Sequence, residues 1–434
     1  MTFDAASRRS PFTWVPSLYF AQGLPFFAVN VVMALMYKSM GVPNEQIARW
    51  SGLLSLAWGI KWLWSPFLEL APSKKAIVVV FQLLGGAGLC LVALSLQLPN
   101  YFLVGIAALT LVSLASATHD IASDGLYIAS LDARQQAEYA GWQGAFFNVA
   151  RFISMGGLVI LAGHLEKSLG VANAWSVVFS LFGATMLVLG LYHGWALPGT
   201  RNAVRADRSL RGVARTLWDV LVAFLGKPGI WLAIFFIIMF RAGEGQVQTI
   251  GPLFLRDARS VGGLGLTTGE VGWAYGTAGT IAFIVGSIVG GYFAAWLGLR
   301  RAMLWLILAM NLPSAAFVFL SSAMPTHFAV IAAALSLEMF GYGFGFVGVI
   351  LYLMQVVSVG RYQTAHYAIG SGVMGLGMSL FKSISGDIQT ALGYQNFFIW
   401  GLLCAVPVLV LSRFVRLDAV AAPPADAPGR PAEA

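Results

Sequence analysis

Residues 76–97 read AIVVVFQLLGGAGLCLVALSLQ, a run of 22 residues without one charged side chain. A helix needs about 20 apolar residues to cross the hydrocarbon core of a bilayer. Lys74 and Lys75 stand directly before the run, and such basic residues typically flank a spanning helix on its cytoplasmic side. The stretch therefore predicts a membrane-spanning α-helix, because any open structure would leave backbone groups unpaired in lipid.

The same pattern recurs along the whole chain of 434 residues, of which 58% are hydrophobic and only 10% are charged. In soluble domains about 25% of residues are charged, and a soluble fold of this size could not hide so much apolar surface. We therefore predict an all-α membrane protein with twelve transmembrane helices. They cover residues 12–36, 47–68, 76–97, 102–129, 140–163, 174–195, 229–253, 269–297, 301–322, 328–356, 363–386 and 396–416.

The basic residues predict how the chain crosses the membrane. With the N-terminus in the cytoplasm, loop Lys and Arg residues favour the inside by about three to one, and an even number of spans places both termini there. The longest internal loop, residues 198–228, is basic, and a surface amphipathic helix is expected from about Leu210 to Phe224. It separates an N-terminal six-helix half, 1–197, from a C-terminal one, 229–416, and residues 417–434 form a tail predicted to be disordered.

The sequence also argues against several other classes of protein. The net charge of +8 comes from residues spread over short loops, so no nucleic-acid partner is expected. Cys90 and Cys404 lie far apart in apolar runs, which argues against a disulfide framework or a metal cage. No P-loop, GxSxG or HExxH motif occurs. We predict that the protein is not an enzyme, holds no cofactor or metal, and draws its energy from a gradient.

Ionisable residues inside the predicted spans are the candidates for function, because charge is costly in lipid. They are Lys61, Asp120, Asp124, Arg151, Arg241, Glu244, Glu338 and Lys382, with His119 beside them.

Asp120 and Asp124 are four residues apart, so both project from one face of the fourth span. Two carboxylates close together and away from water favour one of them keeping a proton near neutral pH, as a proton-coupled carrier requires. Alternatively, each aspartate pairs with a cation, Lys61 or Arg151, and locks helices together. His119 could titrate in the physiological range or could pack with a single hydrogen bond.

Three further charges lie near the middle of their spans: Arg151 in span 5, Arg241 in span 7 and Glu338 in span 10. Arg241 could contact an anionic group of a substrate, or it could pair with Glu244 or Glu338. Lys382 lies in the outer half of span 11, and its long side chain is expected to snorkel outward.

Two glycine-containing segments could shape a cavity. Gln22-Gly23-Leu24-Pro25 in span 1 could break the helix near a substrate, or simply kink it. Residues 338–346, EMFGYGFGF, alternate small and large side chains, which suits close helix packing. The alternative is a flexible gate with Tyr342 in the cavity.

Three motifs resemble the AmpG-like branch of the major facilitator superfamily: residues 23–25, GLP; residues 60–69, IKWLWSPFLE; and residues 116–124, SATHDIASD. That branch includes muropeptide permeases, acetyl-CoA transporters and siderophore importers. The resemblance implies two six-helix halves that face each other across a central cavity.

The resemblance also suggests roles for individual residues. It places Lys61, Asp120 and Asp124 in the functional core. Glu69 stands where the branch usually has Asp, and residues 291–301 keep Gly298, Arg300 and Arg301 of a general facilitator motif but have Ala295 near its acidic position. We expect substrate contacts from Gln22, Lys61, Arg151, Arg241, Glu338 and Tyr342, proton coupling through Asp120, Asp124 and Glu244, and gating by Glu69, Arg300 and Arg301.

We therefore expect a secondary active transporter in the bacterial inner membrane. It would use the proton gradient to take up a bulky polar or anionic small molecule such as a muropeptide, and it would act as a monomer. A siderophore importer and an acyl-CoA-type carrier are the alternatives within the branch. A membrane-embedded acyltransferase using His119 with Asp120, or a receptor that moves nothing, are the alternatives outside it.

Overall fold

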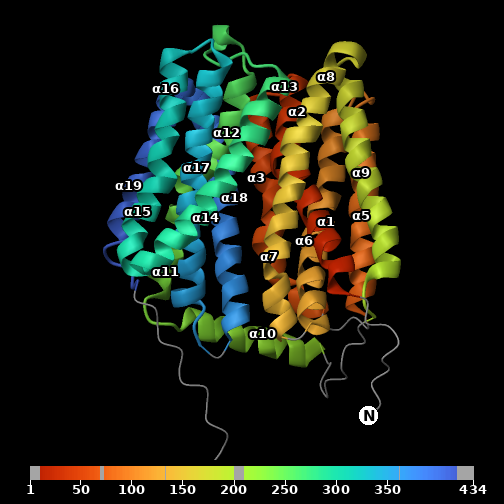
Figure 1. The fold of residues 1–434 in the computed structure, drawn as a ribbon, viewed down its shortest axis with the longest axis vertical. Coiled ribbons are helices and arrows are strands. Elements are labelled where there is room, and N and C mark those ends of the chain that lie inside the picture. The colour runs from red at the N-terminus through yellow and green to blue at the C-terminus, as the bar shows by residue number, and fades with distance from the viewer. Residues whose placement is uncertain (1–9, 69–72, 132, 200–209, 361, 418–434) are drawn as a thin grey trace, which may run out of the picture.

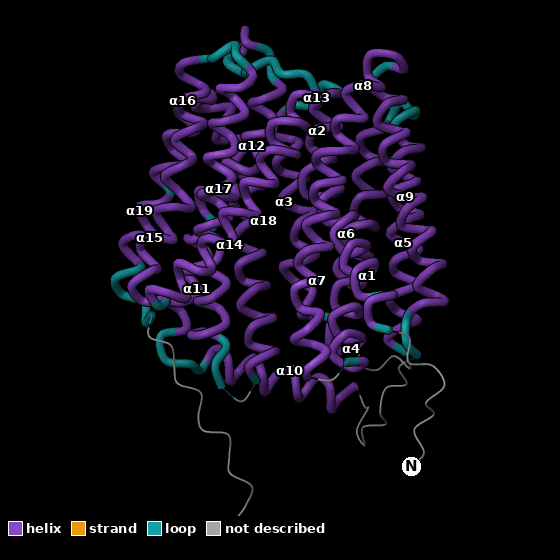
Figure 2. Tube along the Cα trace, viewed as in Figure 1, coloured by secondary structure: helices purple, strands orange, loops and turns teal. Residues whose placement is uncertain are grey.

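The computed structural model describes residues 10–68, 73–131, 133–199, 210–360 and 362–417. All regular secondary structure in these ranges is helical. The helices run between the same two ends of the molecule and are joined by short loops at those ends (Figures 1 and 2). The predicted all-α membrane fold is thus confirmed.

The six spans of the first half follow one another up and down the bundle (Figure 1). Several consist of two helices joined by a π-helical or 3-10 segment, named here η. They are α1 (Val15–Phe27), η3 (Ala28–Val32) and α2 (Met33–Ser39); α3 (Asn44–Ile60), η4 (Lys61–Leu63) and α4 (Ser65–Leu68); α5 (Lys74–Ser95); α6 (Tyr101–Ser130); α7 (Ala133–Arg151), η5 (Phe152–Leu158) and α8 (Val159–Leu169); and α9 (Val171–Ala196).

The second half repeats this layout after α10 (Leu210–Leu225), the helix expected in the basic loop. Its spans are α11 (Ile230–Phe240) and α12 (Ala242–Arg256); α13 (Thr268–Val271), η7 (Gly272–Ala278) and α14 (Gly279–Leu297); α15 (Leu299–Asn311), η8 (Leu312–Ser314) and α16 (Ala315–Ala323); α17 (Phe328–Tyr352) and η9 (Leu353–Val357); and α18 (Gln363–Leu403) with α19 (Ala405–Leu411).

Ten helical stretches in the described ranges are long and apolar enough to cross a membrane, and two features reconcile this number with the predicted twelve. Helix α3 has only 17 residues because Lys61 starts a 3-10 turn. Helix α18 contains two spans separated by Gly393, whose φ of 72° lies in the left-handed region that favours glycine. Span 11 therefore ends at this glycine, a few residues beyond the predicted boundary at 386.

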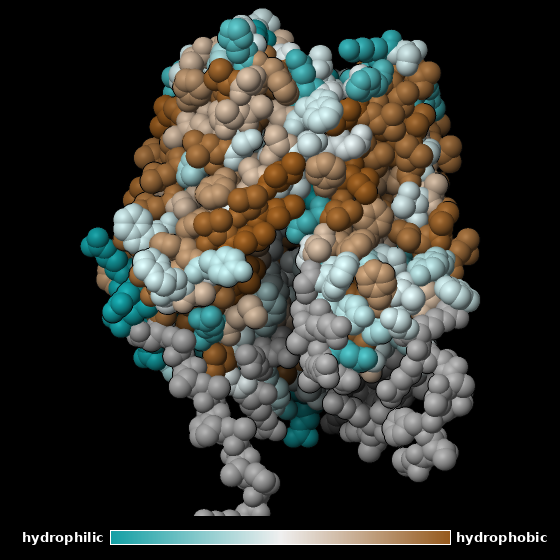
Figure 3. Space-filling view, viewed as in Figure 1, coloured by the Kyte–Doolittle hydropathy of each residue, from teal (hydrophilic) through white to brown (hydrophobic). Residues whose placement is uncertain are grey.

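The outer surface is the one expected of a protein surrounded by lipid. Large apolar side chains such as Trp296, Trp231 and Leu191 are exposed. Apolar residues cover the middle of the face in Figure 3, and hydrophilic residues gather towards its two ends. Lipid replaces water over this middle band, so exposed apolar side chains stabilise the bundle there.

The two halves contact each other mainly through glycines. Helix α3 packs against α18, η5 packs against η7, and α8 packs against α13. A Cβ placed on Gly276 would lie 2.0 Å from the Met155 carbonyl oxygen, and one placed on Gly386 would lie 2.4 Å from Glu45 Cα. Only glycine permits such close approach of two helix backbones, which is the usual way that helices associate in a membrane.

The contacts of α8 with α13 and of Glu45 with Gly386 lie towards the end of the bundle opposite α10, and the crossing of α3 and α18 continues from there to Gly59 and Gly375. Helix α2, the start of α13 and the end of α8 gather at the end opposite α10 (Figure 1). At the α10 end, the face in Figure 3 is hollowed between the two halves. The molecule is therefore closed at one end and recessed at the other.

Gly276→Ala tests the role of these contacts. The added methyl group would overlap the Met155 carbonyl, and we expect it to lower the free energy of unfolding by about 1–3 kcal/mol, as overpacking does. Thermal unfolding in detergent measures the change. Gly291→Ala is the matched control in the same span, because its Cβ would meet nothing within 4 Å. Equal loss of stability in both variants would contradict this account of the interface.

Candidate functional site

An ion pair joins spans 2 and 4 within the first half. Helix α3 ends at Ile60, and the 3-10 turn that follows directs Lys61 towards α6, where its ammonium group contacts the Asp120 carboxylate. The indole of Trp64 donates a hydrogen bond to Thr118 at 3.2 Å beside it. The two charged side chains are only 26% and 12% exposed. Two of the predicted functional residues are thus brought together.

Asp124 lies on the same face of α6, one turn further along, as predicted. It has no cation at ion-pair distance among the described residues. Instead the Tyr19 hydroxyl donates a hydrogen bond of 3.0 Å to it. Asp120 is therefore neutralised by a neighbour, whereas Asp124 is stabilised by a neutral donor only.

His119 faces the protein interior and is 1% exposed. Its Nε2 lies 3.4 Å from the Ser123 hydroxyl, and its Nδ1 has no hydrogen-bond partner among the described residues. Within the same residues, no group of three or more His, Cys, Asp or Glu side chains could hold a metal ion. The contacts of His119 correspond to the packing alternative.

A second ion pair lies at a break in span 7. Arg241 has φ −98° and ψ 0°, outside helical geometry, and separates α11 from α12. Its guanidinium donates to Glu244 at 2.5 and 3.1 Å and lies over the Phe346 ring at 5.0 Å. It also donates to the sulfur of Met378 at 2.7 Å. Of the two predicted partners of Arg241, the structure thus selects Glu244.

Glu338 on α17 is held by neutral groups. The Gln248 side chain donates a hydrogen bond of 3.1 Å to its Oε1, and the Tyr275 hydroxyl donates to the side-chain oxygen of Gln248. The other carboxylate oxygen is buried without a partner in the described part of the chain. Tyr342, one turn further along α17, packs its ring 5.0 Å from that of Phe283.

The glycines of α17 serve close packing. A Cβ on Gly341 would lie 2.4 Å from the Ala309 carbonyl oxygen, and one on Gly343 would lie 2.1 Å from that of Phe283. Backbone of α15 therefore packs closely against Gly341 on one side of this helix, and backbone of α14 against Gly343 on the other. Of the two sequence interpretations, this geometry supports the packing role.

Arg151 crosses from the first half into the second. It is 7% exposed, and its guanidinium lies 4.2 Å from the centre of the Phe283 ring and donates to the sulfur of Met339 at 3.5 Å. It makes no ion pair with a described carboxylate, and its Nε has no described partner. The interpretation that Arg151 locks Asp120 or Asp124 is wrong, because the side chain turns towards the other half.

The position of Lys382 differs from a second prediction, that its side chain extends outward. Instead of snorkelling outward it is 2% exposed, with its ammonium group between the two halves. It donates to the Ser55 hydroxyl at 3.1 Å and to the Asn30 side-chain oxygen at 3.3 Å. The prediction was wrong because sequence position gave the depth of the residue but not the face of α18 on which it lies.

Gln22 is buried in α1, with its side-chain oxygen unpartnered among the described residues. The helix continues through Pro25 and widens into the π-helical segment η3, which contains Asn30. Two other π segments lie beside site residues: η5 follows Arg151, and η7 contains Tyr275. Such segments occur often at functional sites, since they re-aim side chains within a helix.

The predicted gating residues are only partly placed. Glu69 lies outside the described residues. Arg300 and Arg301 stand in the first turn of α15, exposed at the α10 end. Their gating role stays a prediction.

A polar network that the sequence did not reveal seals the opposite end. Asp257, directly after α12, forms an ion pair with Lys38 at 2.6 Å and accepts a hydrogen bond from Asn44 at 3.2 Å. The Tyr394 hydroxyl also donates to it. Lys38 and Asn44 belong to the first half and Asp257 to the second, so this network ties the halves together.

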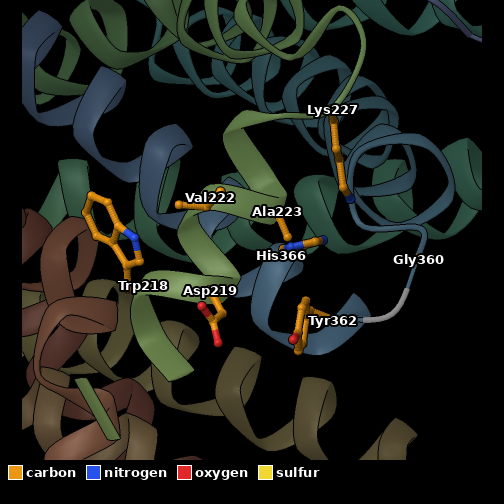
Figure 4. Close-up of a pocket in the computed structure, with 8 residues that line it drawn as sticks. All are labelled: Trp218, Asp219, Val222, Ala223, Lys227, Gly360, Tyr362 and His366. Carbon is orange, nitrogen blue, oxygen red and sulfur yellow. The ribbon is translucent and has the colours of Figure 1, made fainter. Parts of the chain in front are cut away.

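A separate cavity of about 510 Å³ is lined by α10, by Lys227 after it and by residues near the start of α18 (Figure 4). Lys227 lines it and donates to the carbonyls of Val357 and Val359 at 2.6 and 3.0 Å. Burial lowers the pKa of Lys227. The other lining residues are Trp218, Asp219, Val222, Ala223, Gly360, Tyr362 and His366.

Lys61→Gln tests the first ion pair. It leaves the Asp120 charge without its partner, and we expect it to lower the free energy of unfolding by about 2 kcal/mol. The double variant Lys61→Gln/Asp120→Asn should recover most of this loss, because two amides can pair without a charge. Unfolding in mixed micelles measures both. A double variant no more stable than Lys61→Gln would argue against a compensated pair.

Asp257→Asn tests the seal. Loss of this charge should raise the fraction of molecules whose sealed end is open by about tenfold. Spin labels at the exposed residues Lys167 and Ser322, with Cys90 and Cys404 replaced by Ser, should then report longer distances. Asp387→Asn is the control. Its ion pair with Arg49 also joins the halves, but both side chains are more than 50% exposed, and such pairs contribute little. If the distances between the labels are unchanged in Asp257→Asn, the Asp257 network does not hold this end closed.

Comparison with known proteins identifies the fold and the relatives of the chain. It is 24% identical over 401 residues to the anhydromuropeptide permease of Escherichia coli strain K12, covering 91% of this chain and 77% of that protein. It is 22% identical over 406 residues to the putative transporter AmpG 4 of Rickettsia conorii, covering 91% and 94%. The resemblance to AmpG-like proteins is thereby confirmed.

Solved transporters have the same fold. A D-xylose-proton symporter superposes with a TM-score of 0.68 at 12% identity, covering 94% of this chain and 98% of that one. The nucleoside transporter NupG, as a D323A mutant, gives 0.66 at 16% identity, covering 92% and 98%. The family model of the Major Facilitator Superfamily matches residues 15–386. The chain is therefore a multi-pass membrane transporter that belongs to the Major Facilitator Superfamily.

Proposed function

We propose that this transporter is a proton-coupled carrier that takes up a bulky anionic solute, such as a muropeptide, across the bacterial inner membrane. The observation that carries the proposal is the set of buried charges in spans of both halves, with a sealed end on one side and a recess on the other. Charges are kept in a membrane interior at a cost, and in transporters they mark the path of a solute or a proton.

The arrangement supports alternating access. Residues 1–197 and 229–416 would rock against each other, joined by the linker 198–228. The described state is closed by the Asp257 network and recessed at the α10 end. With both termini in the cytoplasm, that recess faces inward, and breaking the network would open the carrier to the outside.

The solute would bind beside Arg151, Arg241 and Gln22, with Glu338 and Tyr342 nearby. Arg151 is the strongest candidate, because its guanidinium is buried against an aromatic ring and a thioether instead of a carboxylate. A carboxylate of the solute would supply the missing charge-assisted hydrogen bonds. The muropeptide class is carried over from the E. coli permease; no relative reported above is named for a siderophore or an acyl-CoA.

Protons would use carboxylates of both halves: Asp120 and Asp124 in the first and Glu244 in the second. Asp124 is held by the neutral Tyr19 hydroxyl, so it can gain and lose a proton without breaking an ion pair. Asp120 with Lys61, and Glu244 with Arg241, would exchange partners during the cycle. We further propose that the carrier works as a monomer.

An acyltransferase is the weaker hypothesis. His119, its candidate base, is 1% exposed and contacts Ser123 on its own helix. A base must reach the proton that it removes, and this ring is enclosed. We therefore infer a carrier and not an enzyme.

Asp124→Asn tests proton coupling in liposomes that contain purified protein and receive a labelled anhydromuropeptide. We expect accumulation driven by an inward proton gradient to fall by about tenfold or more, while exchange of solute at equal pH persists, because only the coupling step is lost. Asp387→Asn, an exposed carboxylate between the halves, should behave as wild type. If uptake by the wild type does not depend on the proton gradient, the coupling proposal is wrong. If the wild type takes up no anhydromuropeptide at all, the proposed solute class is wrong.

A further inference from the structure

The ammonium group of Lys382 is buried among neutral groups. Its contacts are the Ser55 hydroxyl at 3.1 Å and the Asn30 side-chain and main-chain oxygens at 3.3 and 3.5 Å. No described carboxylate lies within ion-pair distance of it. A buried cation is normally paired with an anion, because dipoles alone replace its hydration only in part.

The carboxylates inside the spans already have other partners. Asp120 is paired with Lys61, and Glu244 with Arg241. Asp124 accepts from Tyr19, and Glu338 from Gln248. Met378, one turn before Lys382 on α18, contacts Arg241, so the lysine lies near the neutralised Arg241–Glu244 pair and not near a free anion.

The site is built from both halves of the transporter. Lys382 comes from α18, Ser55 from α3 and Asn30 from the π segment η3. Next to Lys382, a Cβ on Gly52 of α3 would lie 2.0 Å from the Ser383 hydroxyl and 2.6 Å from the Ser379 carbonyl oxygen. This close crossing keeps the ammonium group out of water. The Ser55 hydroxyl lies 2.7 Å from both the Asn30 side-chain oxygen and the Ser51 carbonyl oxygen, so Ser55 and Asn30 form one polar cluster beside the lysine.

We propose that Lys382, Asn30 and Ser55 form an anion site that takes a carboxylate of the transported solute, separate from the contact at Arg151. The inference rests on the proposed function, since it concerns the solute of the same carrier. When the halves separate at the sealed end, the oxygens of Asn30 and Ser55 leave the lysine and a solute carboxylate replaces them. Two buried cations without carboxylate partners, Arg151 and Lys382, then select solutes that carry two anionic groups.

Binding to detergent-solubilised protein tests the site with two probes: an anhydromuropeptide with free peptide carboxylates, and the same molecule with these carboxylates amidated. Wild type should prefer the charged probe. Lys382→Gln should weaken binding of the charged probe by about 10- to 100-fold, change binding of the amidated probe little, and so remove the preference. Lys382→Arg should retain most of it, and Lys167→Gln, an exposed lysine at the end of α8, should behave as wild type. If Lys382→Gln loses affinity for both probes to the same extent, the proposal is overturned.

Thermal unfolding without solute separates this inference from the identity of the solute. Gln can keep the contacts to Asn30 and Ser55 without a charge, so Lys382→Gln should unfold at the same temperature as wild type or higher, whereas Lys61→Gln should unfold at a lower one. If Lys382→Gln lowers the unfolding temperature as much as Lys61→Gln does, then Lys382 stabilises the fold, and the proposed anion site is overturned. If wild type binds neither probe, the muropeptide proposal fails, and this comparison still decides whether the lysine charge lacks a partner.

Discussion

The cost of removing a charge from water determines where the ionisable side chains inside this bundle lie. In the hydrocarbon interior there is no solvent to compensate an ammonium, guanidinium or carboxylate group. Lys61 with Asp120, and Arg241 with Glu244, meet this requirement as ion pairs. Among the described residues, Arg151, Lys382, Asp124 and Glu338 meet it with rings, thioethers, hydroxyls and amides and not with an opposite charge. The second group contains the residues to which we assign the proposed solute and proton contacts.

Backbone geometry sets the direction of several of these side chains. Three of the charged groups stand at or beside a departure from regular α-helix: Lys61 begins a 3-10 turn, Arg241 separates two helices, and Arg151 precedes a π segment. Such interruptions turn side chains away from the direction that a regular helix would give them. They also mark the places where a span can bend while the remainder of the helix stays intact.

The sequence predicted much of the fold because lipid imposes one strong rule, and apolar runs of spanning length obey it. The boundaries failed where geometry is local, as at Gly393, whose left-handed conformation ends span 11 beyond residue 386. The candidate site was found as a list of residues by the same rule of costly charge. Their pairing was not, since depth along a helix does not give the face, and both Lys382 and Arg151 were misassigned for this reason. Asn30, Ser55 and Gln248 are polar residues in apolar runs, which was the available signal for them.

Helix α10 has a mechanical consequence for the passage of a large molecule. It contacts α4 in the first half and α11 and α18 in the second, so it crosses between the two halves at one end of the bundle (Figure 1). A helix of 16 residues is about 24 Å long and resists both stretching and compression. It therefore links the two halves at this end by a segment of nearly fixed length, and the proposed solute would have to pass beside this helix.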